Sequence, residues 1–155
     1  MYYFNDEDQP SLHASSGMTR SFVPKPSYYA IRHMNQTLGD YRFSSVITEE
    51  EGHLYVHSYM HESDENSLIW VAWSPTGSDR EVLITLDNLP GTVLFAEQMA
   101  LADGIAPLVP FVMLDSDSVQ LIVGESPVYL HIQVPEPSGV GLALTGATLL
   151  LRRRR

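Results

Sequence analysis

The stretch SLIWVAWS, residues 67–74, decides the fold. It is uncharged, rich in aromatic and β-branched side chains, and followed by the turn-forming sequence SPTG, residues 74–77. A short apolar run closed by such a turn predicts a central β-strand. The preceding HLYVHSYM, residues 53–60, alternates between two kinds of side chain and predicts a neighbouring strand.

The same period of two continues from residue 42 to residue 133, and Gly and Pro interrupt it about every 8–15 residues. This pattern predicts an antiparallel β-sandwich of about eight strands rather than a parallel sheet, so the expected fold class is mainly β. A turn at 49–52 is expected to join the first two strands. The predicted strands are 42–47, 53–60, 67–74, 81–86, 92–97, 110–114, 119–123 and 127–133.

One packed N-terminal helix is predicted before the strands, at residues 27–38. PKPS, residues 24–27, begins it, because proline fits a first helical turn, where its missing N–H would be unpaired anyway. Gly39 follows where a left-handed C-terminal cap belongs. The apolar side chains at helical spacing, which we expect to pack on the sheet, are Tyr28, Ile31, Met34 and Leu38.

Charge separates the end of the chain from its body. The net charge is −10, from nineteen acidic and nine basic residues, and four of the basic residues are the terminal arginines. The body therefore has five basic against nineteen acidic residues, or −14, and is expected to repel nucleic acid and anionic lipid. The absence of cysteine excludes disulfides and thiol chemistry.

The N-terminal residues MYYFNDED, 1–8, contain no basic region and no apolar region, so they do not form a signal peptide. Since the C-terminal segment described next requires export, we expect the chain to be the C-terminal piece of a longer protein. Asp6, Glu7 and Asp8 are adjacent carboxylates. A solvated loop is favoured over a catalytic or metal-binding cluster, because adjacent side chains on a loop point in different directions.

The segment 134–155 combines Pro135-Glu136-Pro137, an uncharged apolar run at 139–151 and a terminal arginine block. It predicts a hydrophobic helix that anchors the chain in a membrane, with the arginines on the cytoplasmic side. Thirteen residues rise about 20 Å against a hydrocarbon core of about 30 Å, so the arginine stems must cover the shortfall. A buried C-terminal helix is the alternative. The predicted anchor residues are Gly139, Gly141, Leu142, Leu144, Leu149, Leu150 and Leu151, followed by the basic stop Arg152, Arg153, Arg154 and Arg155.

This three-part order resembles the PEP-CTERM sorting signal of exported bacterial proteins. The resemblance covers residues 134–155 and implies recognition by an exosortase, a membrane-embedded protease that cleaves near Pro-Glu-Pro. It also implies transient anchoring in the inner membrane, followed by release or renewed attachment at the cell surface. Proteins of this kind often accompany exopolysaccharide, and the resemblance implies no cofactor.

The body resembles the C-terminal end of a (βα)8-barrel glycoside hydrolase. The resemblance lies in VPKPSYYAIRHMNQTLGDYRF (23–43), LIWVAWSPTG (68–77) and ESPVYLHI (125–132). It implies that YFND, residues 3–6, belongs to the last barrel strand, that 24–38 is the last barrel helix, and that a small β-sandwich follows. The family's catalytic acids lie on earlier barrel strands, so no catalytic residue is carried over. The implied domains are a barrel remnant at 1–39, a β-sandwich at 40–133 and the sorting signal at 134–155.

Aromatic side chains on two strands are the candidates for ligand contact. The odd-numbered residues from His53 to His61 share one strand face, but neighbours at i and i+2 are already about 7 Å apart, so the three imidazoles cannot hold one metal ion. That face is either a weak sugar-stacking surface or an ordinary solvent-facing or helix-facing side of a sheet. The two tryptophans of 67–74 lie on opposite faces, so one is expected in the core. The candidate carbohydrate contacts are Tyr55, Tyr59, Trp70 and Trp73.

The sequence contains no nucleophile elbow, P-loop, HExxH or dinucleotide-binding motif, and its carboxylates fall mostly in turns. We therefore interpret the chain as the non-catalytic accessory domain of an exported, glycosidase-like protein. One alternative is a carbohydrate-binding module. The other is a glycoside hydrolase fragment that needs a separately encoded barrel.

Overall fold

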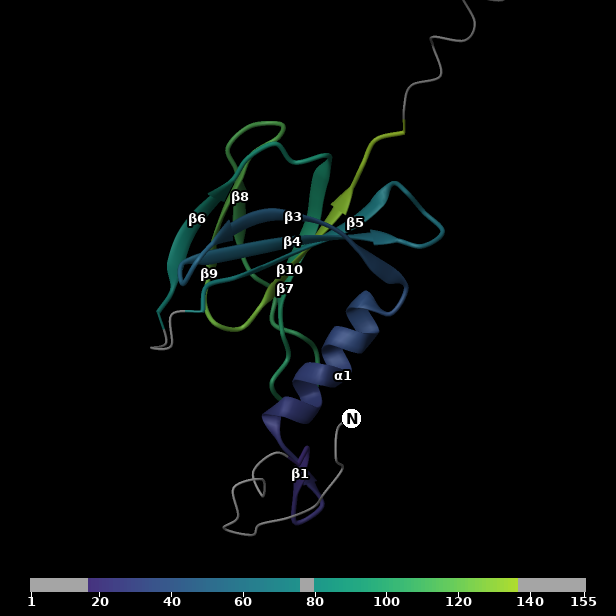
Figure 1. Ribbon diagram of the computed structural model, residues 1–155, viewed down its shortest axis with the longest axis vertical. Coiled ribbons are helices and arrows are strands. Elements are labelled where there is room, and N and C mark those ends of the chain that lie inside the picture. Colours follow the sequence, from purple (N-terminus) through teal and green to yellow (C-terminus); the bar gives the residue numbers. More distant parts are fainter. Residues whose placement is uncertain (1–16, 76–79, 137–155) are drawn as a thin grey trace, which may run out of the picture.

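The computed structural model describes residues 17–75 and 80–136, and within them the chain is mainly β (Figure 1). Eight strands form two antiparallel sheets, with strand orders β3-β4-β5-β10-β7 and β6-β9-β8, and a short β1–β2 hairpin stands apart from them. The elements are β1 Thr19–Arg20, β2 Val23–Pro24, α1 Pro26–Leu38, β3 Tyr41–Glu50, β4 Leu54–His61, β5 Ser67–Trp73, β6 Val82–Leu86, β7 Thr92–Gln98, β8 Phe111–Met113, β9 Val119–Val123 and β10 Val128–Gln133.

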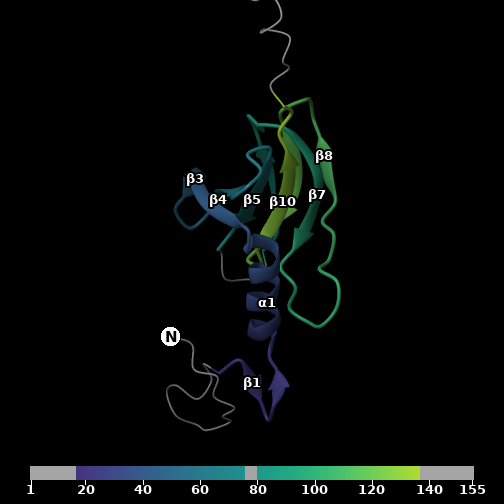
Figure 2. The same cartoon turned by 90° about the vertical axis from the view of Figure 1, so that its right-hand side faces the viewer.

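The two sheets face each other across one hydrophobic core (Figure 2). Alternate side chains of β4, β5, β7 and β10 meet those of β6 and β9, because successive side chains of a strand point to opposite faces. Four residues of this core have no exposed surface: Val56, Ala72, Val119 and Leu130. The predicted antiparallel arrangement of strands is confirmed, and each of the eight predicted strands is present.

Strand β3 differs most from its prediction, since it runs to Glu50 instead of ending at residue 47. Its pairing with β4 shifts between Phe43 and Ser45 and again between Val46 and Thr48. Each shift inserts a residue into one strand, which moves the following side chains to the opposite face. The period of two is therefore lost in the sequence of β3 although the strand continues.

Helix α1 is confirmed, but its cap and its packing face differ from the prediction. Gly39 has φ −54° and ψ −41°, a right-handed conformation, so the predicted left-handed cap is wrong. Met34 was expected to pack on the sheet and is 39% exposed, whereas His33 is the buried residue of the helix. The physical reason is that the sheet offers a polar partner, Glu97, to the side of α1 that carries His33.

Helix α1 packs on the outer face of the five-stranded sheet, the face opposite the shared core. Leu38, at its C-terminal end, contacts a cluster built on Ile69, Val71 and Tyr129. Its N-terminal half extends beyond the end of the sandwich toward the β1–β2 hairpin (Figure 2). Only part of the outer face is therefore covered by the helix.

Several predicted features fall outside the described residues. These are the implied barrel strand at 3–6, the carboxylates Asp6, Glu7 and Asp8, part of the turn at 74–77, Pro137 of the sorting motif, and the hydrophobic and arginine segments at 139–155. Within residues 17–75 and 80–136, no helix has the length and apolar character needed to cross a membrane. The predicted C-terminal membrane helix thus stays a prediction.

Candidate functional site

Strand β4 presents the predicted aromatic and imidazole side chains on one face. Tyr55, His57, Tyr59 and His61 are half-buried, and they alternate with inward-facing Leu54, Val56 and Ser58, which are buried. The predicted alternation is therefore confirmed over this part of β4. Met60 is the exception on the inner face at 37% exposed.

The outer side chains of β3, β4 and β5 pack into what we call the outer aromatic strip: Phe43, Tyr55, His57, Tyr59 and Trp73. Tyr55 and Trp73 stand opposite each other in the β4–β5 pairing, and their rings stack with centroids 5.3 Å apart and planes 13° apart. His57 meets Trp73 edge-on at 4.9 Å. Phe43 meets His57 and Tyr59 edge-on at 5.8 and 5.9 Å. These are the offset and edge-to-face arrangements that aromatic quadrupoles favour.

The structure separates the two candidate tryptophans. Trp70 belongs to the core and is 3% exposed, whereas Trp73 is half-exposed on the outer face. Trp70 borders a groove of about 420 Å³ between β3 and the end of β6, but with so little exposed surface it cannot present a ring face to a sugar. The prediction of a carbohydrate contact is wrong for Trp70. Trp73 joins the candidates Tyr55 and Tyr59 in the outer aromatic strip.

Phe43 is the member of the strip that sequence reasoning missed. It is 56% exposed, and it lies on β3 directly opposite Tyr59. The bulges of β3 hide its face in the sequence pattern. Its position next to the predicted strand 53–60 was the only available signal, because a cross-strand neighbour on an antiparallel pair shares that strand's face.

A second group of functional side chains lies between α1 and the five-stranded sheet. We call it the Glu97 cluster, and it consists of His33 and Thr37 on α1, Glu97 on β7 and His131 on β10. Glu97 Oε1 lies 3.3 Å from His33 Nε2, 3.3 Å from His131 Nε2 and 3.3 Å from Thr37 Oγ1. Burial lowers the pKa of His131, and neighbouring His33 lowers it further, although hydrogen bonding and attraction to Glu97 oppose the shift.

The Glu97 cluster is not arranged as a metal centre. No group of three or more His, Asp or Glu side chains within residues 17–75 and 80–136 is placed to hold a metal ion. The two imidazoles instead converge on a single carboxylate oxygen, together with a hydroxyl. This geometry suits hydrogen bonding between the helix and the sheet.

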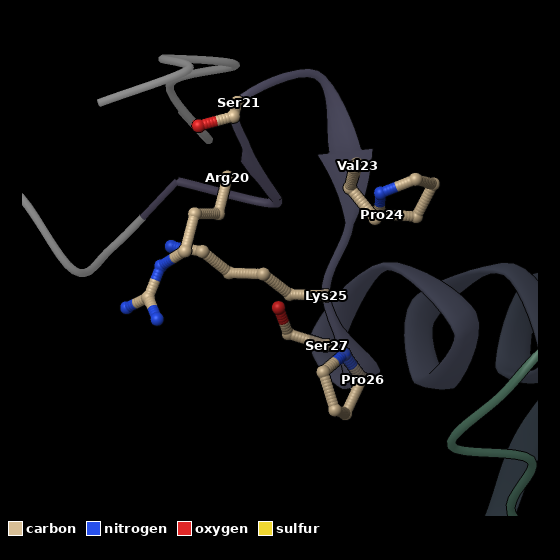
Figure 3. A pocket seen from close by; sticks show the side chains of 7 residues that line it. All are labelled: Arg20, Ser21, Val23, Pro24, Lys25, Pro26 and Ser27. Atoms are coloured by element: carbon tan, nitrogen blue, oxygen red, sulfur yellow. The ribbon is translucent and has the colours of Figure 1, made fainter. Parts of the chain in front are cut away.

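The hollow between the β1–β2 hairpin and the start of α1 has a volume of about 660 Å³. Figure 3 shows the side chains of Arg20 and Lys25, two of its lining residues, extending to the same side. Paired cations beside a helix N-terminus are suited to an anion. Arg20 and Lys25 nevertheless both have interaction partners within the chain, so their charges are not left for a ligand alone.

The middle of α1 is linked to the loop between β7 and β8. Arg32 donates a hydrogen bond of 2.8 Å to Asp103 and lies over the rings of Tyr28 and Tyr29. The hydrogen bond from Arg32 lowers the pKa of Asp103.

Comparison with protein-family models, with curated proteins and with solved structures finds no match to this chain.

Proposed function

We propose that this chain is a non-catalytic accessory β-sandwich domain of an exported, glycosidase-like protein, and that residues 134–155 sort and anchor it in the cell envelope. The proposed partner of that segment is an exosortase-type membrane protease. The observation that carries the proposal is the place where the segment joins the fold. It continues from β10, a strand paired on both sides, with β5 and with β7.

The junction itself is held by hydrogen bonds. The N–H of Val134 donates to the carbonyl of Asn66 at 2.7 Å, and the side-chain amide of Gln133 donates to the same carbonyl at 3.1 Å. A force applied through residues 135–155 would therefore act on β10, a central strand that is hydrogen-bonded to β5 and β7, and not on an edge strand with one neighbour. This attachment suits a domain that is held at a membrane surface by its C-terminal segment.

Helix α1 supports the accessory role. One side of it packs on the sheet, while Tyr28, Tyr29 and Ile31 are only half-buried and Met34 is exposed. In the glycoside hydrolases that the body resembles, the matching helix belongs to the barrel. Such a helix would contact the barrel on one side and the sandwich on the other, and the exposed apolar side of α1 is consistent with that position.

The sorting proposal is tested by fusing residues 130–155 to a secreted reporter in a host that has an exosortase. We expect the fusion to be retained in the membrane and then to lose its C-terminal segment, because the apolar run is held in lipid and stopped by the arginines. Fractionation and mass spectrometry of the reporter measure both steps.

Two altered fusions serve as controls for that experiment. Replacing Arg152, Arg153, Arg154 and Arg155 with serine should abolish retention, and replacing Pro135, Glu136 and Pro137 with alanine should leave the reporter anchored and uncut. A fusion that stays soluble at full length contradicts the proposal. So does a fusion that behaves identically with and without the arginines.

Carbohydrate binding is the second candidate function, and the outer aromatic strip favours it. Phe43 is 56% exposed and contacts the half-buried rings of His57 and Tyr59, and His57 in turn contacts Trp73. An aromatic surface therefore remains accessible on β3, β4 and β5. Aromatic rings bury large apolar areas against flat partners, and the ring faces of sugars are flat. The expected ligand class is a neutral or cationic polysaccharide, since the body carries a charge of −14 and repels anions.

Affinity electrophoresis of residues 17–136 in gels containing neutral polysaccharides tests this candidate. Phe43→Ala is expected to weaken binding about 2- to 10-fold, the loss that corresponds to one aromatic contact. Val112→Ala is the matched control, because Val112 is 59% exposed on the other sheet. Equal mobility of both variants and the parent protein in every gel would rule out a sugar-binding role for the strip.

A further inference from the structure

The contact between α1 and the sheet has an unusual polar centre. Glu97 Oε1 lies 3.3 Å from each of three groups: Thr37 Oγ1 and His33 Nε2 on the helix, and His131 Nε2 on β10. Thr37 Oγ1 also lies 3.4 Å from His33 Nε2. Apolar contacts of Leu38 with the cluster of Ile69, Val71 and Tyr129 continue the same interface. The Glu97 carboxylate, on edge strand β7, therefore links β7 and its neighbour β10 to the helix.

The Glu97 cluster is largely shielded from solvent. The side chains of Glu97 and His131 are each 18% exposed, and that of His33 is 11% exposed. An ionised carboxylate only accepts hydrogen bonds, so each imidazole that bonds to it through Nε2 carries its proton there. A second proton on either ring would occupy Nδ1, and in the described part of the chain the buried Nδ1 of His33 has no hydrogen-bond partner.

A single carboxylate of the cluster, Glu97, would have to compensate added positive charge on either imidazole. Glu97 is the carboxylate in contact with both imidazoles, and Tyr129 on β10 faces His33 edge-on at 5.2 Å, with Tyr59 on β4 beyond it. The nearest cation on the helix, Arg32, is paired with Asp103. Phe95 stacks on His131 at 4.0 Å and covers it with an apolar ring.

We propose that the Glu97 cluster is an acid-sensitive latch, which holds α1 on the sheet near neutral pH and releases it when His131 takes up a proton. Release would uncover Ile69, Val71 and Tyr129, which are buried in the docked state and adjoin Trp73 and Tyr59 of the outer aromatic strip. Acid would thus extend the exposed apolar surface of the outer face. The inference goes beyond the proposed function and holds for the sandwich whether or not residues 134–155 are a sorting signal.

The direction of the pH effect follows from proton linkage. The pKa of His131 is lowered in the docked state, while in the released state water surrounds the imidazole and its pKa returns toward about 6.5. The released state therefore binds the extra proton more readily. Docking is fully favoured above pH 6.5 and weakens as the pH falls below that value.

Hydrogen exchange measures the release directly. In the full chain, we expect the opening equilibrium of the α1 amides at residues 33–38 to rise between pH 7.5 and pH 5.5, by at most about 10-fold, after correction for the intrinsic exchange rate. The amides of β9, which lie in the shared core, should keep their protection. A parallel rise in β9 would mean global unfolding, and no rise in α1 would mean no latch. Either result overturns the proposal.

Two variants separate His131 from the other titrating groups. His131→Gln keeps a side-chain N–H donor for Glu97 but does not titrate, so its α1 opening should be the same at both pH values. His53→Gln is the matched control, because the His53 side chain is 51% exposed and lies outside the cluster. The His53→Gln variant should keep the rise in α1 opening that the parent protein shows. A His131→Gln variant that opens in acid as the parent does would also contradict the latch.

Discussion

Trp70→Ala is expected to lower the free energy of unfolding by about 3–5 kcal/mol. Trp70 is 3% exposed and lies between the two sheets, in contact with the core that both of them share. Its removal deletes a large buried apolar surface and leaves a cavity that the surrounding strands cannot fill. Urea unfolding, followed by circular dichroism so that the signal does not depend on tryptophan, measures the loss.

Trp73→Ala is the comparison that gives this experiment its meaning. Trp73 lies on the outer face, half-exposed and stacked on Tyr55, so its removal is expected to cost only about 1–2 kcal/mol. The same variant removes part of the outer aromatic strip, whereas Trp70→Ala does not. Equal losses for the two variants would contradict the division of the tryptophans between a core and a surface role.

Alkaline titration is expected to destabilise the sandwich through Tyr129. Burial raises the pKa of Tyr129 to about 12, and the charges of Tyr59 and Glu97 add to the shift. The unfolded chain titrates near 10, so the folded state holds the proton more tightly. The stability that Tyr129 contributes is therefore complete below pH 10 and is lost as the pH rises through 12. The expected loss is about 2–3 kcal/mol.

Tyr129→Phe isolates this effect from the other tyrosines. The variant keeps the ring between α1 and the sheet but has no phenolic proton, so its unfolding free energy should fall less between pH 9.5 and pH 12. Denaturant midpoints measured at matched pH values give the difference. Identical alkaline losses in the parent and the variant would show that Tyr129 is not the group responsible.

The strands and the helix could be predicted from the sequence because their signals are local. Runs such as SLIWVAWS and the alternating HLYVHSYM fix an extended backbone, and Gly and Pro mark where it turns. The failure at β3 is also local in origin. One residue is inserted before Val46 and another after it, and each insertion moves the following side chains to the opposite face, so the period of two does not persist along β3.

The candidate site was predictable only in part. The face shared by Tyr55, His57 and Tyr59 follows from alternation alone, and that expectation is confirmed. Phe43 was missed, because its place opposite Tyr59 depends on the register of two strands. The whole Glu97 cluster was missed for a related reason. Glu97 is separated from His131 by 34 positions and from Thr37 by 60, and nothing in the local sequence connects them.

By itself, the sequence determined the type of the helix and of the eight sandwich strands, and the two faces of a strand that keeps a period of two, such as β4. It also determined the acidic body and the apolar, arginine-ended segment on which the sorting proposal rests. Only the tertiary structure decided which face is inside, and hence that Trp70 and not Trp73 is the core residue. The tertiary structure likewise turned His33 rather than Met34 toward the sheet. The physical reason is that the periodicity of a sequence shows which side chains share a face of a strand or helix. Which of those faces is buried, and which polar groups it meets, depends on the other elements that pack against it.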